Sequence, residues 1–229
     1  MTESIEPPVT PPPAQGVVPL FPLPGLFLFP GTALPLHIFE PRYRQMIEDL
    51  LDRNGRLVLG TVVPGHEHEL MGAPPVHAIA GLGEIARHER YPDGRFVIFV
   101  VGLKRVRLTE VASDRPYRKV EVAPLAEQQP TPAETAALRK ELMVAVKARS
   151  PSVVLPPNVP VGQLTDLLLL HLKLDVTTMI ELYSQLDVAE RARGALARHA
   201  ATPLPPPEAK KPDVKRAEPP PDEGTPPSS

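Results

Sequence analysis

The sequence contains no cysteine and no tryptophan among its 229 residues, and aromatic residues make up 4% of it. Without cysteine, the chain has no disulfide bond, no thiolate metal ligand and no cysteine nucleophile. This absence fits a reducing compartment. The net charge is −2, so no overall excess of positive charge attracts nucleic acid or anionic membranes.

Long apolar runs are also lacking. The longest helix-compatible run lies around Leu167–Leu172, far short of the roughly 20 residues that span a bilayer. The first ten residues, MTESIEPPVT, place acidic residues and prolines where a secretory signal has basic residues and then an apolar stretch. We therefore expect a soluble, cytoplasmic protein with no membrane partner.

Proline, in contrast, is abundant, and its position divides the chain. Of the 33 prolines, five lie in residues 1–15 and ten in residues 203–229. The latter segment mixes charges of both signs with almost no large apolar residue, so it cannot bury enough surface to offset the entropy of ordering. We predict a disordered tail at each end. The predicted units are 1–15, a tail; 16–126, rich in strands; 127–202, helical; and 203–229, a proline-rich tail.

Most of the segment from Val17 to Leu125 has the pattern of β-strands. Runs of β-branched and aromatic residues are separated by Gly, Pro and Asp, and the predicted strands are LFLF, TALPLHIF, RLVLGTVV, HAIAGLGEIARHERY, RFVIFVVGLKRVRLTEV and YRKVEVAPL. Pro92-Asp93-Gly94 predicts a hairpin turn. Residues 96–101 are apolar at both alternating sets of positions, which predicts a central strand covered by protein on both faces.

Helices are predicted at one place among the strands and throughout the second half. Apolar residues recur at helical spacing after Pro41 until Asn54-Gly55, so one helix interrupts the strands. Several short strands with one helix suggest a small, partly closed barrel. Thr131 and Glu134 form a capping box that opens a helix to about Arg149. Further helices follow around Leu164–His171, after Asp175 and after Asp187, the last with Glu190 completing a second predicted capping box.

Three stretches, taken in order, resemble the amino-terminal substrate-recognition domain of Lon proteases. They are VVPLFPLPGLFLFPGTALPLHIFEPRYRQMI, GLGEIARHERYPDGRFVIFVVGLKRVRL and LTDLLLLHLKLDVTTMIELYSQLDVAERARGAL. The resemblance runs from about Val17 to Ala201. It implies an α+β fold, in which a PUA-like barrel precedes a helical subdomain. It also implies a role in binding unfolded or tagged polypeptide, as an adaptor or chaperone-like protein, with a separate protease as a candidate partner.

Full Lon proteases add an ATPase module and a serine–lysine peptidase to this region. Phosphate binding on such a module requires GxxxxGK[ST], whose amides cradle the phosphates while the lysine neutralises them. No lysine of this chain follows a glycine. The resemblance therefore predicts a stand-alone member of the family that is not an enzyme and binds no cofactor.

Two polar clusters suggest alternatives. Gly65-His66-Glu67-His68-Glu69 has two histidines at alternate positions, but Leu70 stands where HExxH needs its second histidine, so a solvated loop is preferred to a metal site. The stretch 104–119 is the most basic of the chain, and PUA-like barrels include RNA binders, which makes an RNA-binding protein the alternative function. Because Arg105 and Arg107 alternate with apolar residues, as in a half-exposed strand, nucleic acid is the less favoured partner.

Polypeptide binding needs apolar side chains that stay exposed. Most of the phenylalanines are expected in the core, and Met71 in a long loop and Tyr91 at the hairpin are expected to stay accessible. The candidate polypeptide-binding residues are Phe27, Phe39, Met71 and Tyr91.

Overall fold

The computed structural model describes residues 16–205, in which strands precede helices as the sequence predicts. The elements in chain order are β1 (Val17–Pro24), β2 (Ala33–Ile38), α1 (Pro41–Leu51), β3 (Arg56–Val62), the short 3₁₀ helix η1 (Glu67–Glu69), β4 (Ile79–Arg90), β5 (Phe96–Val111), β6 (Lys119–Pro124), α2 (Pro132–Arg149), α3 (Val161–Leu170), α4 (Val176–Ser184) and α5 (Val188–Ala201). The predicted disorder of 1–15 and of nearly all of 203–229 lies outside the described residues.

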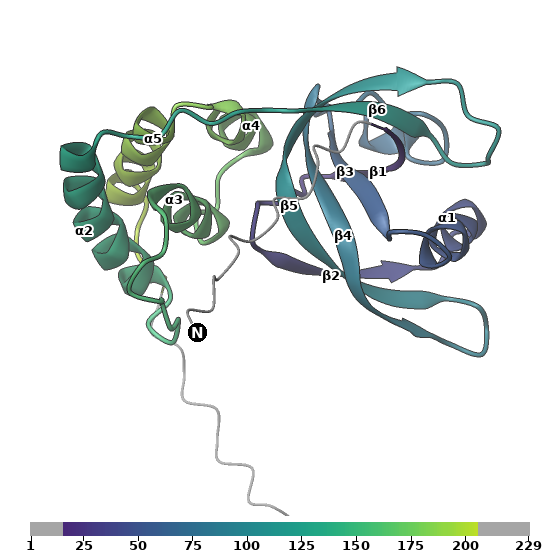
Figure 1. Cartoon of the computed structure of the whole chain (residues 1–229), viewed down its shortest axis with the longest axis horizontal. Coiled ribbons are helices and arrows are strands. Elements are labelled where there is room, and N and C mark those ends of the chain that lie inside the picture. Colours follow the sequence, from purple (N-terminus) through teal and green to yellow (C-terminus); the bar gives the residue numbers. More distant parts are fainter. Residues whose placement is uncertain (1–15, 206–229) are drawn as a thin grey trace, which may run out of the picture.

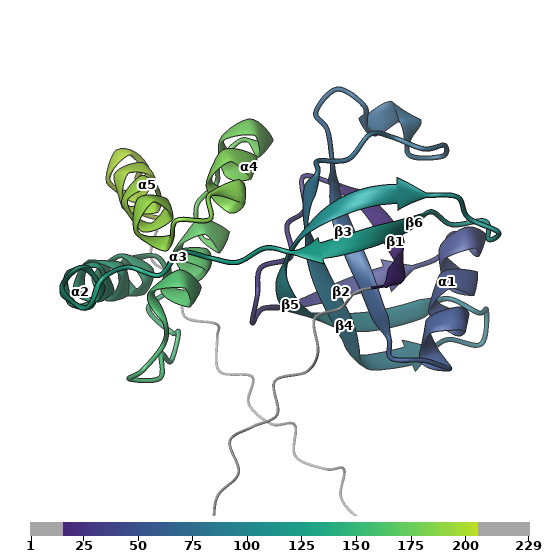
Figure 2. The same ribbon diagram turned by 45° about the horizontal axis from the view of Figure 1, so that its top comes forward.

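Five strands form a closed barrel. The sheet order is β2-β5-β4-β3-β1-β6, and β6 pairs with β5 as well as with β1, which closes the ring β1-β3-β4-β5-β6. Strand β2 stays outside this ring, because it pairs with the first half of β5 alone. The barrel and the helices α2–α5 lie side by side, and α1 lies at the end of the barrel away from those helices (Figures 1 and 2). This arrangement confirms the predicted α+β fold.

The predicted strand LFLF is wrong. Residues 26–29 have no regular structure, and β1 lies earlier in the chain. Leu28 belongs to the barrel core and Phe29 to the core of the helices, so the segment crosses from one core to the other instead of pairing in a sheet. Its backbone passes directly over two glycines of the barrel. A Cβ atom at Gly102 would lie 2.1 Å from the Phe29 carbonyl oxygen, and one at Gly81 would lie 2.4 Å from that of Leu28.

The barrel core extends to α1. Phe96, Ile98 and Val100 of β5 are buried together with Met46 and Ile47 of α1, so the apolar side of this helix covers one end of the barrel. The helix begins at Pro41, which suits a first turn because proline lacks the N–H that would be unpaired there.

The helical half begins as its sequence predicts. At the start of α2, the Thr131 side chain accepts from the Glu134 N–H and the Glu134 carboxylate accepts from the Thr131 N–H, which confirms the first capping box. The second box is only half formed, because the Asp187 N–H donates to Gln185 rather than to Glu190. The predicted division at residue 126 lies between the last strand and α2, and its status as a subdomain boundary stays a prediction. Across residues 16–205, the helices are all too short or too polar to cross a bilayer.

Candidate functional site

Two of the four candidate residues meet in one pocket. Phe39 follows β2 and is 63% exposed, and Tyr91 at the β4–β5 hairpin is 40% exposed. Both line a pocket of about 320 Å³, together with His37, Arg95 and Phe96. The hairpin that presents Tyr91 turns at Gly94, whose φ of 83° supplies the left-handed conformation that the sequence predicts there. The exposure predicted for Tyr91 is confirmed.

Met71 is the most exposed of the four, at 84%, and it lies in the loop between β3 and β4. This loop is fixed to the start of α1 by Arg42. The Arg42 guanidinium donates to the carbonyl oxygens of Leu70, Met71 and Gly72, and it forms an ion pair with Glu40 at 2.9 Å. Met71 and Phe39 are therefore both attached to the first turn of α1. The exposure predicted for Met71 is confirmed, whereas its role in binding stays a prediction.

Phe27 lies elsewhere. It is half-buried between the barrel and the helices, where its ring centroid is 5.3 Å from that of Tyr183 and 6.5 Å from that of Phe29. The structure thus places Phe27 among aromatic residues that join the two halves of the molecule, and apart from the pocket of Phe39 and Tyr91.

The outer face of β5 is more open than its sequence predicts. Phe96, Ile98 and Val100 are buried inside the barrel, but the alternating residues Val97 and Val101 are half-buried and Phe99 is 38% exposed. No layer of protein in the described part of the chain covers this face, so the prediction of cover on both sides is wrong. Val97, Phe99 and Val101, with Pro35 of β2, are called the outer apolar strip here.

Neighbouring strands extend this strip toward the pocket. Pro35 lies directly opposite Phe99 on one side, and Arg87 lies opposite it on the other with its guanidinium 6.0 Å from the ring centroid. His37 pairs with Val97 and also lines the pocket of Phe39 and Tyr91. The strip and the pocket therefore form one continuous surface.

The edge of β2 borders the same surface. Within the described residues, β2 pairs with β5 only, so its other edge carries backbone groups that another chain can pair with (Figure 1). Pro35 has no N–H, which leaves this edge with fewer donors than a regular strand.

The basic stretch 104–119 divides between surface and interior, because Arg107 is exposed and Lys104 half-buried whereas Arg105 is buried. Arg105 is 2% exposed, so the half-exposed position predicted for it is wrong. Its guanidinium donates to both carboxylate oxygens of Asp166 at 2.7 and 3.1 Å, to Glu127 at 2.9 Å and to the Tyr183 carbonyl oxygen at 2.8 Å. Burial disfavours the charge, but the carboxylates outweigh that effect and raise the pKa of Arg105. This residue joins the barrel to the helices.

Other polar residues of the predicted clusters have local partners. Arg118 donates to both carboxylate oxygens of Glu110 at 2.7 and 2.6 Å, and Lys119 forms an ion pair with Asp114. In the histidine cluster, His66 Nδ1 lies 2.8 Å from the Glu69 carboxylate. The described residues contain no group of three or more potential ligands placed to hold a metal ion.

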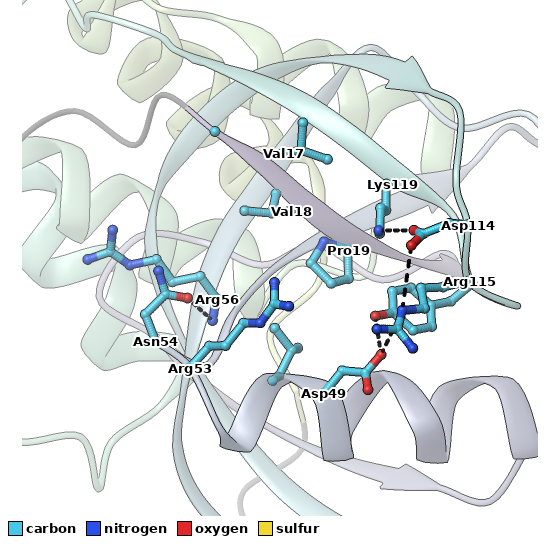
Figure 3. A pocket seen from close by; sticks show the side chains of 13 residues that line it. Val17, Val18, Pro19, Asp49, Arg53, Asn54, Arg56, Asp114, Arg115 and Lys119 are labelled. Carbon is cyan, nitrogen blue, oxygen red and sulfur yellow. Dashed lines mark hydrogen bonds and ion pairs between the residues drawn. The ribbon is translucent and has the colours of Figure 1, made fainter.

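A second pocket, of about 410 Å³, lies between β1 and the end of α1, and the sequence gives no indication of it (Figure 3). Its side chains come from three separate segments, and Arg53, Arg115 and Lys119 are among them. Arg53 looks like an ordinary residue of a helix end in the sequence. Only the fold brings it near the other two.

Comparison with known proteins gives a consistent result. The family described as the ATP-dependent protease La (LON) substrate-binding domain matches residues 17–197. Lon protease of Dictyoglomus thermophilum is 25% identical over 184 residues, which are 76% of this chain and 23% of that protein. Lon protease of Flavobacterium johnsoniae is 28% identical over 142 residues, or 59% of this chain and 17% of that protein. The chain thus spans less than a quarter of the length of these curated relatives.

Solved structures show the same fold. The N-terminal domain of the Mycobacterium avium complex Lon protease superposes with a TM-score of 0.61 at 17% identity, covering 81% of this chain and 98% of that one. The Lon N-terminal domain protein from Xanthomonas campestris gives a TM-score of 0.57 at 21% identity, covering 80% and 98%.

Proposed function

The chain belongs to the family of Lon substrate-binding domains, and from this premise we propose that it is a non-enzymatic module that binds unfolded or tagged polypeptide. The binding surface we propose is the outer apolar strip together with the pocket of Phe39 and Tyr91. In this role the protein acts as an adaptor or as a chaperone-like holder of unfolded chains, with a separate protease as a candidate partner.

One observation carries the proposal. The outer face of β5 is apolar, it is open, and it lies beside the unpaired edge of β2. An unfolded chain is extended and presents apolar side chains at alternate positions, which matches a strand edge beside an apolar face. Phe39 and Tyr91 end this surface in a pocket that accepts one larger side chain.

The charges nearby favour apolar recognition over nucleic-acid binding. Among the basic residues that suggest an RNA surface in the sequence, Arg105 is buried and Arg118 and Lys119 are paired with carboxylates, whereas Arg107 is exposed. Phosphate-driven binding requires several free cations, each of which displaces counterions. RNA binding is the alternative function, and the experiment described next tests it as well.

The test uses a reduced, carboxymethylated protein that cannot refold, with a fluorescent label, and measures anisotropy. Phe99→Thr, Tyr91→Ser and Phe39→Ser each remove an exposed ring from the proposed surface, and these exposed changes affect folding little. We expect Phe39→Ser to weaken binding by about tenfold, since fully burying such a ring contributes about 1.5–3 kcal/mol. Tyr91→Ser and Phe99→Thr should weaken it less, because these rings are only 40% and 38% exposed before binding. Val144→Ser is the matched control, because Val144 is also exposed but lies on α2.

Two further measurements distinguish polypeptide binding from RNA binding and from enzymatic activity. Affinity for the unfolded protein should depend weakly on salt, and the purified protein should hydrolyse neither ATP nor casein. Equal loss of affinity in Val144→Ser, or binding to single-stranded RNA with a steep salt dependence and none to unfolded protein, would count against the proposed surface and function.

A further inference from the structure

The pocket between β1 and α1 arises because β1 changes partner along its length. Its first residues, Val17–Pro19, pair with β6, whereas pairing with β3 begins only at Leu20. A gap therefore opens between the start of β1 and the start of β3, above the last turn of α1. This gap is the 410 Å³ pocket, and its apolar wall includes Val18, Pro19 and Leu50.

The charged side chains of the pocket are not balanced. Its lining contains four cations, Arg53, Arg56, Arg115 and Lys119, against two carboxylates, so the surplus is +2. Arg56 also pairs with Glu84 outside the pocket at 3.2 Å, which reduces the surplus to +1.

Arg53 is the source of this surplus. Asp114 pairs with Lys119 and lies 4.0 Å from Arg115, which also lies 3.6 Å from Asp49. None of the ion pairs found among residues 16–205 includes Arg53. Its guanidinium extends into the space beside Val18 and Pro19 (Figure 3).

Tyr117 keeps Asp49 from neutralising this cation. Its hydroxyl donates to the Asp49 carboxylate at 2.6 Å, so that carboxylate already serves both a tyrosine and Arg115. Burial, with the hydrogen bond to Asp49, raises the pKa of Tyr117 to about 12, and the hydroxyl remains a donor at neutral pH. The two carboxylates are thus occupied, and Arg53 is available to an anion from solution.

We propose that this pocket binds a small organic phosphate, a ligand that lies outside the polypeptide-binding function proposed above. Arg53 pairs with the phosphate, and Arg115 and Lys119 on the opposite wall add to the attraction. The volume falls in the range of about 300–1,000 Å³ typical of small-molecule sites and far exceeds a phosphate group. The organic part of the ligand therefore contacts Val18, Pro19 and Leu50.

A nucleic acid fits this site less well than a small molecule. Binding along a nucleic-acid backbone needs a row of free cations, each neutralising one phosphate. Beyond the pocket, Arg118 is paired with Glu110 and Arg105 is buried, so these two arginines do not extend a row of free cations from the rim. The pocket accordingly offers one confined anion site.

The test is an amide NMR titration of the full chain at constant ionic strength. The probes are inorganic phosphate, ribose 5-phosphate, adenosine 5′-monophosphate and phosphoenolpyruvate, with chloride as the blank. We expect saturable shifts at Arg53, Asn54 and Lys119 with inorganic phosphate, and tighter binding of at least one organic phosphate. Arg53→Gln should weaken that binding by about tenfold or more. Arg198→Gln, which changes an exposed arginine on α5, should leave it unchanged.

Several results would overturn the proposal. They are shifts no larger than those with chloride, equal affinity in Arg53→Gln, or pocket shifts produced only by an oligonucleotide or by the free carboxyl terminus of a peptide. Loss of binding to unfolded protein in Phe99→Thr would concern the outer apolar strip and would not affect the test of the Arg53 pocket.

Discussion

Replacing Asp166 by asparagine should destabilise the protein by about 3–5 kcal/mol. Asp166 is 2% exposed and lies between two buried guanidinium groups, those of Arg105 and Arg191. With Glu127, these residues form a network of two cations and two carboxylates whose net charge is zero when both carboxylates are ionised. Burial raises the pKa of Asp166, and the charges and hydrogen bonds of the two arginines act against that effect. Asparagine keeps the shape of Asp166 but leaves the network with a net charge of +1 beside two guanidinium groups that are at most 2% exposed.

The magnitude follows from the cost of a lone charge. Removing one partner of a buried ion pair costs more than the pair itself contributes, because the remaining charge stays desolvated. With a urea m-value of about 2 kcal/mol per M, the unfolding midpoint should fall by about 1.5–2.5 M. Urea titrations followed by far-ultraviolet circular dichroism measure this shift. The control Asp114→Asn removes an exposed carboxylate, and surface pairs contribute about 0–1 kcal/mol.

A double variant tests whether the unbalanced charge is the cause of the destabilisation in Asp166→Asn. Arg105→Met combined with Asp166→Leu removes one cation and one carboxylate together, so the network returns to zero net charge. We expect this variant to be more stable than Asp166→Asn alone. A midpoint for Asp166→Asn within about 0.5 M of the unchanged protein would show that an unbalanced charge in this buried network does not destabilise the fold.

Three further predictions concern single residues. Gly102→Ala should lower the free energy of unfolding in urea by about 3 kcal/mol or more, because its Cβ would lie 2.1 Å from the Phe29 carbonyl oxygen. Gly16→Ala should lower it by less than about 0.5 kcal/mol, because a Cβ there would have nothing within 4 Å. Folding raises the pKa of Tyr117 from 10.0 to about 12, so its contribution to the free energy of unfolding is present below pH 10 and lost as pH rises through 12; Tyr117→Phe should flatten the stability profile across that range. Thr131→Ala should remove about 1 kcal/mol by opening the capping box of α2, measured by thermal unfolding.

Each of these has a contrary result. An equal loss of stability in Gly102→Ala and Gly16→Ala would mean that residues 26–29 do not pass close to β5. An unchanged pH profile in Tyr117→Phe would place the tyrosine in water, and unaltered melting in Thr131→Ala would show that the cap is replaced by solvent.

Local features were predictable because their causes lie within a few residues. Thr131 and Glu134 satisfy backbone donors of their own turn, and Gly94 supplies the conformation that its hairpin needs. The resemblance to Lon domains predicted the order of strands and helices correctly. It did so through three stretches that together cover both halves of the chain.

Features that depend on distant residues were not predictable in the same way. Arg105 alternates with apolar neighbours like a surface residue, and only Asp166, 61 positions away, explains its burial. Leu28 and Phe29 read as a strand because both are apolar, although each belongs to a different core.

The candidate site contains features that the sequence predicted and features that it did not. Exposure of Met71 and Tyr91 followed from their places in a loop and a turn, whereas the open face around Phe99 did not, because an apolar run cannot show which of its faces the protein covers. The pocket around Arg53 depends on where β1 changes partner, and no short pattern encodes that.

The most direct test of polypeptide binding at the proposed surface is hydrogen–deuterium exchange of the full chain with and without a saturating unfolded protein. We expect slower exchange in residues 33–39 and 91–101, because a bound chain covers the edge of β2 and the outer apolar strip. Exchange in α2 and α5 should not change. Protection confined to the helices, or no protection despite measurable binding, would show that unfolded protein does not bind at the edge of β2 and the outer apolar strip.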